Sequence, residues 1–297
     1  MLRVFRFGAC HAHIPEHRAA DSRADPQPEI AQTYRDRGHT VIRNALNRTT
    51  LEEVQRSVAK RLISSGVSDG TYTEQGQLRH LERENEDPAD LVLDETSRLK
   101  VVEPCFQDPN LVKHIGELLD CDELFSHPLK WIRSLPPQES ETSFPAGVHQ
   151  DYMELQGSSR QLTMWAPVFP VSKVSGSFPL FNTDGTKSLL PMRLAENPSG
   201  WEVTSEALGE RFVYDLDVGD VLIFNTFTPH GGATNSSDGI RVSIEARYQP
   251  LEDPMSASYL ARPVIRSDWD EHYVGWSDRW AHHWRDRHPA TIPFDDT

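Results

Sequence analysis

Short runs of alternating hydrophobic and polar residues fill the second half of the chain, and this pattern predicts β-strands. The runs lie at residues 125–134, 161–169, 177–181, 211–214, 220–224 and 240–249. Proline and glycine punctuate the intervals between them, as at Gly219, which precedes an apolar run. Many short strands bounded by turn signals are typical of a β-sandwich or barrel. We therefore expect a mainly β core with flanking helices.

The first half of the chain shows helical spacing instead. It predicts a short helix at residues 29–37, a strand at 39–45, a longer helix that ends near Ser65 and a further helix at 108–119. The longer helix begins at a capping box, in which the Thr49 hydroxyl caps the helix and Glu52 lies three residues on. Its apolar residues recur at the spacing of one helix face: Leu51, Val54, Val58 and Leu62.

The two ends of the chain differ from its middle in residue composition and pattern. Residues 1–27 are polar and irregular, so we expect an N-terminal arm followed by one domain over residues 28–297. This domain divides into a helical part at 28–124, a barrel core at 125–250 and a tryptophan-rich extension at 251–297. In the extension, Trp276, Trp280 and Trp284 recur every four residues. Such spacing predicts a C-terminal helix that docks on the barrel or, in a homodimer, on a second subunit.

Two polar stretches interrupt the regular elements. Residues 66–98 are loop-like and form a candidate lid. Residues 182–209 are rich in polar residues and proline and are too long for a hairpin turn, so we expect them to form an excursion from the barrel.

Composition narrows the classes of partner. The 297 residues carry a formal net charge of −15, which disfavours a nucleic acid or an anionic membrane as partner. No apolar run approaches the roughly twenty residues of a membrane span. The three cysteines are widely spaced and odd in number, so they predict no disulfide framework. We expect a cytoplasmic protein, in a reducing compartment that suits ferrous iron, with a small molecule as substrate.

The strongest chemical signal is a His-x-Asp motif, His149 and Asp151, followed much later by His230. On a strand, His149 and Asp151 share one face and Gln150 points the other way. His230 ends an apolar segment and precedes Gly231, where the backbone can approach a metal closely. Each residue alone is common in structural roles. Together, two imidazoles and one carboxylate predict the facial triad of a non-haem Fe(II) oxygenase.

A cation eleven residues after His230 suggests a co-substrate. Arg241 begins an alternating strand, and Ser243 shares its face. A 2-oxo acid that chelates iron leaves a distal carboxylate, which the planar fork of an arginine can bind through two hydrogen bonds. The Ser243 hydroxyl can donate to the same carboxylate. An ordinary exposed strand residue is the alternative for Arg241.

Residues 148–248 resemble the phytanoyl-CoA dioxygenase-like family of Fe(II)/2-oxoglutarate-dependent oxygenases. The matching segments are 148–151, 162–165, 219–224, 229–232, Asn235 and 241–243. The resemblance implies a double-stranded β-helix, a jelly roll or cupin-like barrel. It also implies iron held by His149, Asp151 and His230, with 2-oxoglutarate anchored by Arg241 and Ser243, and O₂ as oxidant. Thr163 and Trp165, on the strand after the His-x-Asp motif, are expected near the co-substrate.

The chain also departs from the family pattern, at residues 175–178, 185–187 and Gly232. These places usually contact substrate and co-substrate, so an acyl-CoA substrate does not carry over. Halogenating relatives lack the carboxylate ligand. Because Asp151 is present, we expect a hydroxylase and not a halogenase.

The predicted function is oxidation of an unactivated C–H bond of a small metabolite, as a tailoring step in secondary metabolism. Expected substrate contacts are Lys130, Arg133, Tyr152 and Phe178, with core packing or a position on the surface as the alternative for each. The competing hypothesis is a jelly-roll protein that binds metal without catalysis, or without 2-oxoglutarate.

Overall fold

A computed structural model describes residues 27–81, 100–137, 147–183, 187–194, 201–231, 234–261, 263, 268–276, 281 and 283–293. The expected N-terminal arm therefore lies almost wholly outside the described residues. Among the helices of the described part, none is long and apolar enough to cross a membrane.

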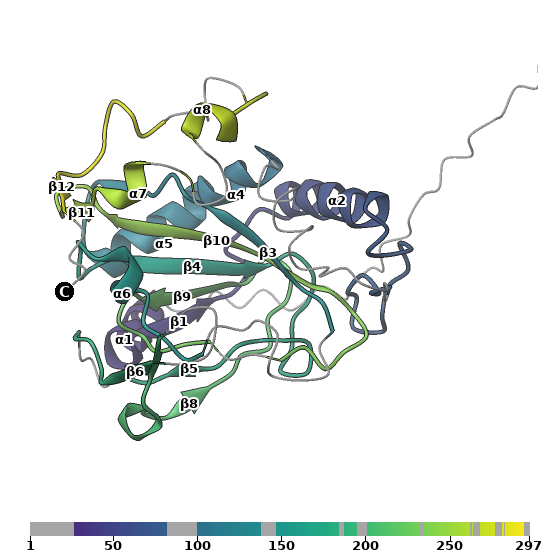
Figure 1. The fold of residues 1–297 in the computed structure, drawn as a ribbon, viewed down its shortest axis with the longest axis horizontal. Coiled ribbons are helices and arrows are strands. Elements are labelled where there is room, and N and C mark those ends of the chain that lie inside the picture. The colour runs from purple at the N-terminus through teal and green to yellow at the C-terminus, as the bar shows by residue number, and fades with distance from the viewer. Residues whose placement is uncertain are drawn as a thin grey trace, which may run out of the picture.

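The centre of the molecule is an antiparallel sheet with the strand order β1-β9-β4-β10-β2 (Figure 1). Its strands are β1 (His39–Ile42), β9 (Val221–Asn225), β4 (Leu162–Pro167), β10 (Arg241–Pro250) and β2 (Leu124–Ser126). A further strand, β3 (Trp131–Leu135), also pairs with β10. The ten-residue β10 is the longest of these strands and pairs with β2, β3 and β4.

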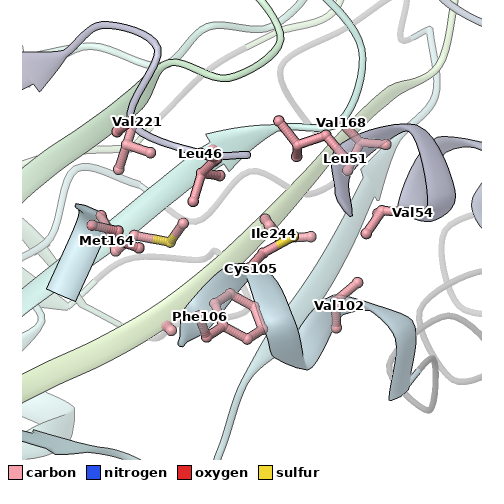
Figure 2. Packing of buried hydrophobic residues seen from close by; sticks show 14 of the residues in the cluster. Leu46, Leu51, Val54, Val102, Cys105, Phe106, Met164, Val168, Val221 and Ile244 are labelled. Atoms are coloured by element: carbon pink, nitrogen blue, oxygen red, sulfur yellow. The ribbon is translucent and has the colours of Figure 1, made fainter. Parts of the chain in front are cut away.

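Helices cover one face of this sheet (Figure 1). They are α1 (Gln27–Arg37), α2 (Arg48–Ser64), the 3-10 turn η1 (Lys100–Val102), α4 (Glu103–Phe106) and α5 (Pro109–Leu119). Leu51 and Val54 of α2 pack in one apolar cluster with Phe106 of α4 and with Met164 and Ile244 of the sheet (Figure 2). This cluster buries the spaced apolar positions that predicted the helices.

A smaller layer covers the other face of the sheet. In it, β5 (Leu180–Phe181) pairs with β8 (Arg211–Phe212), and isolated bridges join Val171 to Leu216 and Leu180 to His230. Apolar side chains of both layers meet between them: Trp165, Val171, Phe178, Leu180, Leu216, Leu222 and Phe224. Two facing antiparallel layers form the jelly roll that the strand pattern predicted.

The excursion at residues 182–209 is more regular than we expected. It contains an antiparallel strand pair, β6 (Met192–Leu194) with β7 (Trp201–Val203), and a 3-10 turn, η2 (Ser205–Ala207). The backbone N–H of Val203 donates to the Val148 carbonyl at 2.7 Å. The described part of the excursion is therefore attached directly beside His149.

Several local expectations were wrong for identifiable reasons. The side chain of Asn47, and not Thr49, caps α2, because its amide oxygen accepts from the backbone N–H groups of Thr49 and Thr50. The predicted strand at 125–134 is two strands, β2 and β3, with Pro128 between them. Proline has no N–H to donate to a neighbouring strand.

The helix at 108–119 is confirmed, with Asp108 as its cap.

The candidate lid is packed where the structure describes it. Residues 66–81 turn back on themselves through a bridge between Tyr72 and Leu78, and Arg79 forms a bridge to Gly239. Leu78 is fully buried. The remainder of the expected lid lies largely outside the described residues.

In the described part of the tryptophan-rich extension, Trp276 and Trp284 lie outside helices, and residues 277–280 of the predicted helix lie outside the described residues. The described elements are β11 (Met255–Ser256), paired in parallel with β12 (Thr291–Ile292), and the short helices α7 (Ser258–Ala261) and α8 (Trp269–His272). Turns follow α8, Trp284 lies in another turn, and Trp280 lies outside the described residues. Trp269 and Trp284 instead pack against Phe125 and Leu129, so the extension docks on its own barrel through aromatic contacts. A second subunit stays a prediction.

Candidate metal centre

The two predicted histidines meet through their backbones. His149 and His230 exchange both backbone hydrogen bonds in an isolated antiparallel bridge, at 2.9 and 3.0 Å. This pairing places the two ring centroids 4.5 Å apart. Gly231 follows with φ +118°, a conformation that favours glycine and ends the pairing. Residues about eighty apart in sequence thus become neighbours.

Asp151 reaches the histidines in a way that differs from the expected strand. It has helical backbone angles and precedes the short helix α6 (Tyr152–Leu155). Gln150 does point away from the site, as predicted, because its amide donates to the carbonyls of Phe227 and Ser188. The chain leaves the strand immediately after His149, and the turn brings the carboxylate back toward the two rings.

Three donor atoms converge as a result. Asp151 Oδ1 lies 3.6 Å from His230 Nε2 and 3.8 Å from His149 Nε2. All three ligand atoms lie within 4.8 Å of one another, in the only such group found among the described residues. Two imidazole nitrogens and one carboxylate oxygen are the donor set of a facial triad, which suits Fe(II) and leaves three further positions.

The tautomers of both rings are fixed by backbone carbonyls. His149 Nδ1 donates to the Gly147 carbonyl at 2.9 Å, and His230 Nδ1 donates to the Thr228 carbonyl at 3.0 Å. A carbonyl can only accept, so each Nδ1 carries the proton and each Nε2 keeps its lone pair. Both lone pairs are therefore available on the side that faces Asp151 Oδ1.

The second carboxylate oxygen of Asp151 is held by other strands. Thr163 Oγ1 of β4 donates to Asp151 Oδ2 at 2.7 Å, and Arg247 Nη2 of β10 lies 3.4 Å from the same oxygen. We predicted a co-substrate contact for Thr163. The observed bond is to the ligand carboxylate, and the co-substrate role stays a prediction.

The electrostatics of the cluster favour the forms that bind a cation. Burial raises the pKa of Asp151, but the Arg247 guanidinium and both imidazoles lower it by more. The net pKa therefore lies below the usual range of an aspartate. Burial, helped by the neighbouring His149, lowers the pKa of His230 to about 4. Near neutral pH the centre therefore presents an ionised carboxylate and a neutral His230 ring.

Arg241 and Ser243 fit a carboxylate that comes from outside the protein. Arg241 is buried, and its Nη1 donates to the Gly176 carbonyl at 2.9 Å. Its Nε and the Ser243 Oγ are buried without a hydrogen-bond partner among the described residues. Burial and the nearby Arg133 lower the pKa of Arg241 to about 10. Unsatisfied buried donors are costly, and an anion between them would satisfy both.

Gly176 explains one departure from the family pattern. It has φ +93°, and a Cβ at this position would lie 3.1 Å from Leu135 Cδ2 and 3.4 Å from Arg241 Cδ. Glycine therefore lets the backbone carbonyl lie against the guanidinium.

A series of rings connects Arg241 with the histidines. The guanidinium carbon lies 5.8 Å from the Trp165 ring centroid. Trp165 contacts Phe178 edge-on at 5.3 Å, and Phe178 lies 5.8 Å from the His230 ring. Trp165 and Phe178 thus lie between the predicted co-substrate anchor and the candidate metal ligands, and their roles beside the co-substrate and substrate stay predictions.

The other predicted substrate residues have different surroundings. Tyr152 stacks on Phe227 at 4.5 Å, immediately after Asp151. Arg133 is 32% exposed, and its Nε donates to Glu245 Oε2 at 3.1 Å. Lys130 forms a buried ion pair with Glu103 at 2.6 Å. Its predicted contact with substrate stays a prediction.

Sequence reasoning missed Gln150, Glu245 and Arg247. Gln150 holds the excursion, because its Oε1 accepts from the Leu190 backbone N–H at 2.7 Å. Glu245 and Arg247 are buried and paired at 2.9 Å. Strand alternation could have identified both, because they share a face with Arg241 and Ser243.

Comparisons with known proteins agree with this geometry. A sequence model of the family described as phytanoyl-CoA dioxygenase matches residues 34–243. A curated relative, the 1-deoxypentalenic acid 11-beta-hydroxylase of Streptomyces arenae, is 24% identical over 246 residues, which cover 76% of this chain and 82% of the relative.

Solved structures show the same fold. The epimerase SnoN, in complex with Fe3+, alpha ketoglutarate and nogalamycin RO, superposes with a TM-score of 0.57 at 17% identity, over 91% of this chain and 96% of that chain. The carbocyclase SnoK from nogalamycin biosynthesis superposes with a TM-score of 0.54 at 17% identity, over 92% and 95% of the two chains.

Proposed function

Because this chain belongs to the phytanoyl-CoA dioxygenase family, we propose that it is an Fe(II)- and 2-oxoglutarate-dependent oxygenase of a small metabolite. The observation that carries the proposal is the convergence of His149 Nε2, His230 Nε2 and Asp151 Oδ1 within 4.8 Å. In this proposal the three side chains hold the ferrous ion. The bound ion, with 2-oxoglutarate and O₂, supplies the oxidation of an unactivated C–H bond.

The protein contributes orientation and exclusion of water. Arg241 and Ser243 bind the distal carboxylate of 2-oxoglutarate, because Arg241 Nε and Ser243 Oγ are buried and have no hydrogen-bond partner among the described residues. Trp165 and Phe178 pack between this anchor and His230 and keep water from the space between them. Thr163 supports the carboxylate ligand from β4.

Hydroxylation is the outcome that we propose. Asp151 supplies the third ligand, so the position that a halide would need is filled by the protein. The hydroxylase from Streptomyces arenae supports the same outcome. Epimerase and carbocyclase activities of structural neighbours make product analysis part of the test.

We further propose that the substrate carries an acidic group that pairs with Arg133. Arg133 is the most exposed of the three arginines around the cluster, at 32%. Its guanidinium therefore lies where an anionic group of a substrate can reach it. Tyr152 and Phe178 are proposed as the neighbouring substrate contacts.

The test is anaerobic reconstitution with Fe(II) and 2-oxoglutarate. We expect the weak visible charge-transfer band of a chelated 2-oxo acid, then succinate release on addition of O₂. The matched variant His149→Ala removes a ligand that is only partly buried, so it should fold normally and show neither signal. Folded, metal-loaded wild type that shows no band and no succinate would contradict the proposal and favour a non-catalytic jelly roll. Turnover without 2-oxoglutarate would favour an oxygenase of another kind.

A further inference from the structure

The polar face of β10 carries a buried ion pair that the proposed ligands and co-substrate contacts do not use. Arg247 Nη2 lies 2.9 Å from Glu245 Oε1, and Glu245 Oε2 accepts from Arg133 Nε at 3.1 Å. Glu245 and Arg247 are each 7% exposed. The cost of taking two charges out of water largely offsets the gain from pairing them. Such a pair is a weak source of stability, so its other contacts are the ones that can give it a role.

The other contact of Arg247 is the candidate ligand Asp151. The same Nη2 atom that binds Glu245 lies 3.4 Å from Asp151 Oδ2. One terminal guanidinium nitrogen, with its two hydrogens, thus bridges the two carboxylates. Arg133, the other partner of Glu245, is not among the partners of Asp151 in the described part of the chain, so the two arginines differ in this respect.

The two oxygens of Asp151 are assigned to different neighbours. Oδ1 faces the Nε2 atoms of both histidines, whereas Oδ2 receives Thr163 Oγ1 and Arg247 Nη2. Asp151 is also the cap residue of α6, yet its side chain makes no capping hydrogen bond. The carboxylate is therefore free of its own backbone and is oriented from β4 and β10 alone. Rotation about its last bond would break the contacts to Oδ2.

We infer that Arg247, held in place by Glu245, is a positioning residue that acts with Thr163 to present a single oxygen of Asp151 to the metal ion. The inference rests on the metal centre of the proposed function. Glu245 has a second part in it. A lone guanidinium beside the ligand would repel a divalent cation, and the neighbouring carboxylate cancels that charge without giving up the orientation.

The charge-neutral double variant Arg247→Met/Glu245→Gln separates orientation from charge. It removes the bridge to Asp151 Oδ2 and leaves the net charge near the site unchanged. Anaerobic titration with Co(II), which does not require O₂ or 2-oxoglutarate, measures the metal affinity directly. We expect the dissociation constant to rise at least about tenfold, because loss of a partner that orients a ligand typically weakens metal binding by 10–100-fold. The visible Co(II) spectrum should also change, since a carboxylate free to rotate can bind through both oxygens.

Three further variants serve as controls for the double variant. Arg133→Met removes the other partner of Glu245 without touching Asp151, so it should bind Co(II) no more weakly than wild type. Thr163→Val should weaken binding and Thr163→Ser should restore it, because only the hydroxyl contacts Oδ2. A purely structural role for the ion pair would lower the melting temperature of the metal-free protein and leave the Co(II) spectrum of the folded fraction unchanged.

The outcomes distinguish this inference from the proposed function. Wild type that fails to bind Co(II) overturns both. Wild type that binds, together with a double variant of equal affinity and spectrum, overturns the inference alone. If the double variant does not fold, Arg247→Lys keeps the charge but loses the planar fork. Weakened Co(II) binding by Arg247→Lys then supports the inference, and wild-type binding overturns it.

Discussion

The two faces of β10 are equally buried but chemically opposite. All ten residues of the strand are buried. One face carries Arg241, Ser243, Glu245, Arg247 and Gln249, and the opposite face packs Val242, Ile244, Ala246 and Tyr248 in the apolar cluster beneath the helices. Burial of apolar area stabilises the fold by roughly 25 cal/mol per Å². Burial of charges costs free energy. The apolar face of β10 therefore stabilises the fold, and the polar face carries the residues of the proposed function.

The largest effect on stability should come from the apolar face. Ile244 is fully buried in the cluster that joins the sheet to α2 and α4. We expect Ile244→Ala to lower the free energy of unfolding by about 2–5 kcal/mol, because a cavity remains where the side chain was. Urea denaturation measures this loss, and succinate release per folded molecule should change little. A comparable loss of turnover in the folded fraction would show that the two faces are not independent.

The opposite result is expected for Arg241, on the polar face. Burial lowers the pKa of its guanidinium to about 10, so the fold holds this charge at a cost. Arg241→Met should therefore leave the free energy of unfolding unchanged or raised. Loss of a hydrogen-bonded charge, worth about 1.5–3 kcal/mol, should raise the 2-oxoglutarate concentration for half-maximal turnover by roughly 10–100-fold. A variant that uses the co-substrate as well as wild type does would contradict the assignment of Arg241.

Acid should destabilise the folded protein by protonating buried histidines on the polar side of the sheet. Burial lowers the pKa of His127 to about 3 and, with help from Arg37, that of His39 to about 4. Because the folded-state pKa is depressed, the unfolded chain binds more protons between these values and about pH 6.5. Stability of the metal-free protein should be complete above pH 6.5. It should fall as the pH drops toward 4, by up to about 1.4 kcal/mol per pH unit for each histidine.

His127→Gln sharpens this prediction. His127 Nε2 lies 2.9 Å from Gln249 Oε1, and a glutamine at position 127 supplies an amide donor that does not titrate. Urea denaturation at several pH values should then give a shallower loss of stability between pH 6.5 and 4. An unchanged slope would mean that other groups carry the acid sensitivity.

Local patterns predicted much of the fold and failed where packing decides. Strand β10 followed from alternation, and α5 followed from its Asp108 cap. The spacing of the tryptophans did not predict that Trp284, in a turn, packs with Trp269 against Phe125 and Leu129, because such a long-range contact is not encoded in local sequence.

The same limit applies to the site. The convergence of His149, Asp151 and His230 was predictable from their order and types, although the turn at Asp151 was not. Glu245 and Arg247 were overlooked because a polar face on an alternating strand usually faces solvent. Only the second layer, which closes over that face, makes these charges part of the interior.

The smallest predicted effects come from single-atom deletions on opposite faces of β10. Ser243→Ala removes a buried hydroxyl that has no partner among the described residues, so the free energy of unfolding should stay the same or rise slightly. Ile244→Val removes one methyl group from the adjacent apolar position and should cost about 0.5–1.5 kcal/mol. The effects on turnover should be the opposite. Ser243→Ala should raise the 2-oxoglutarate concentration for half-maximal turnover several-fold, and Ile244→Val should leave it unchanged. If Ser243→Ala destabilised the protein as much as Ile244→Val does, the hydroxyl would belong to the core and not to the co-substrate anchor.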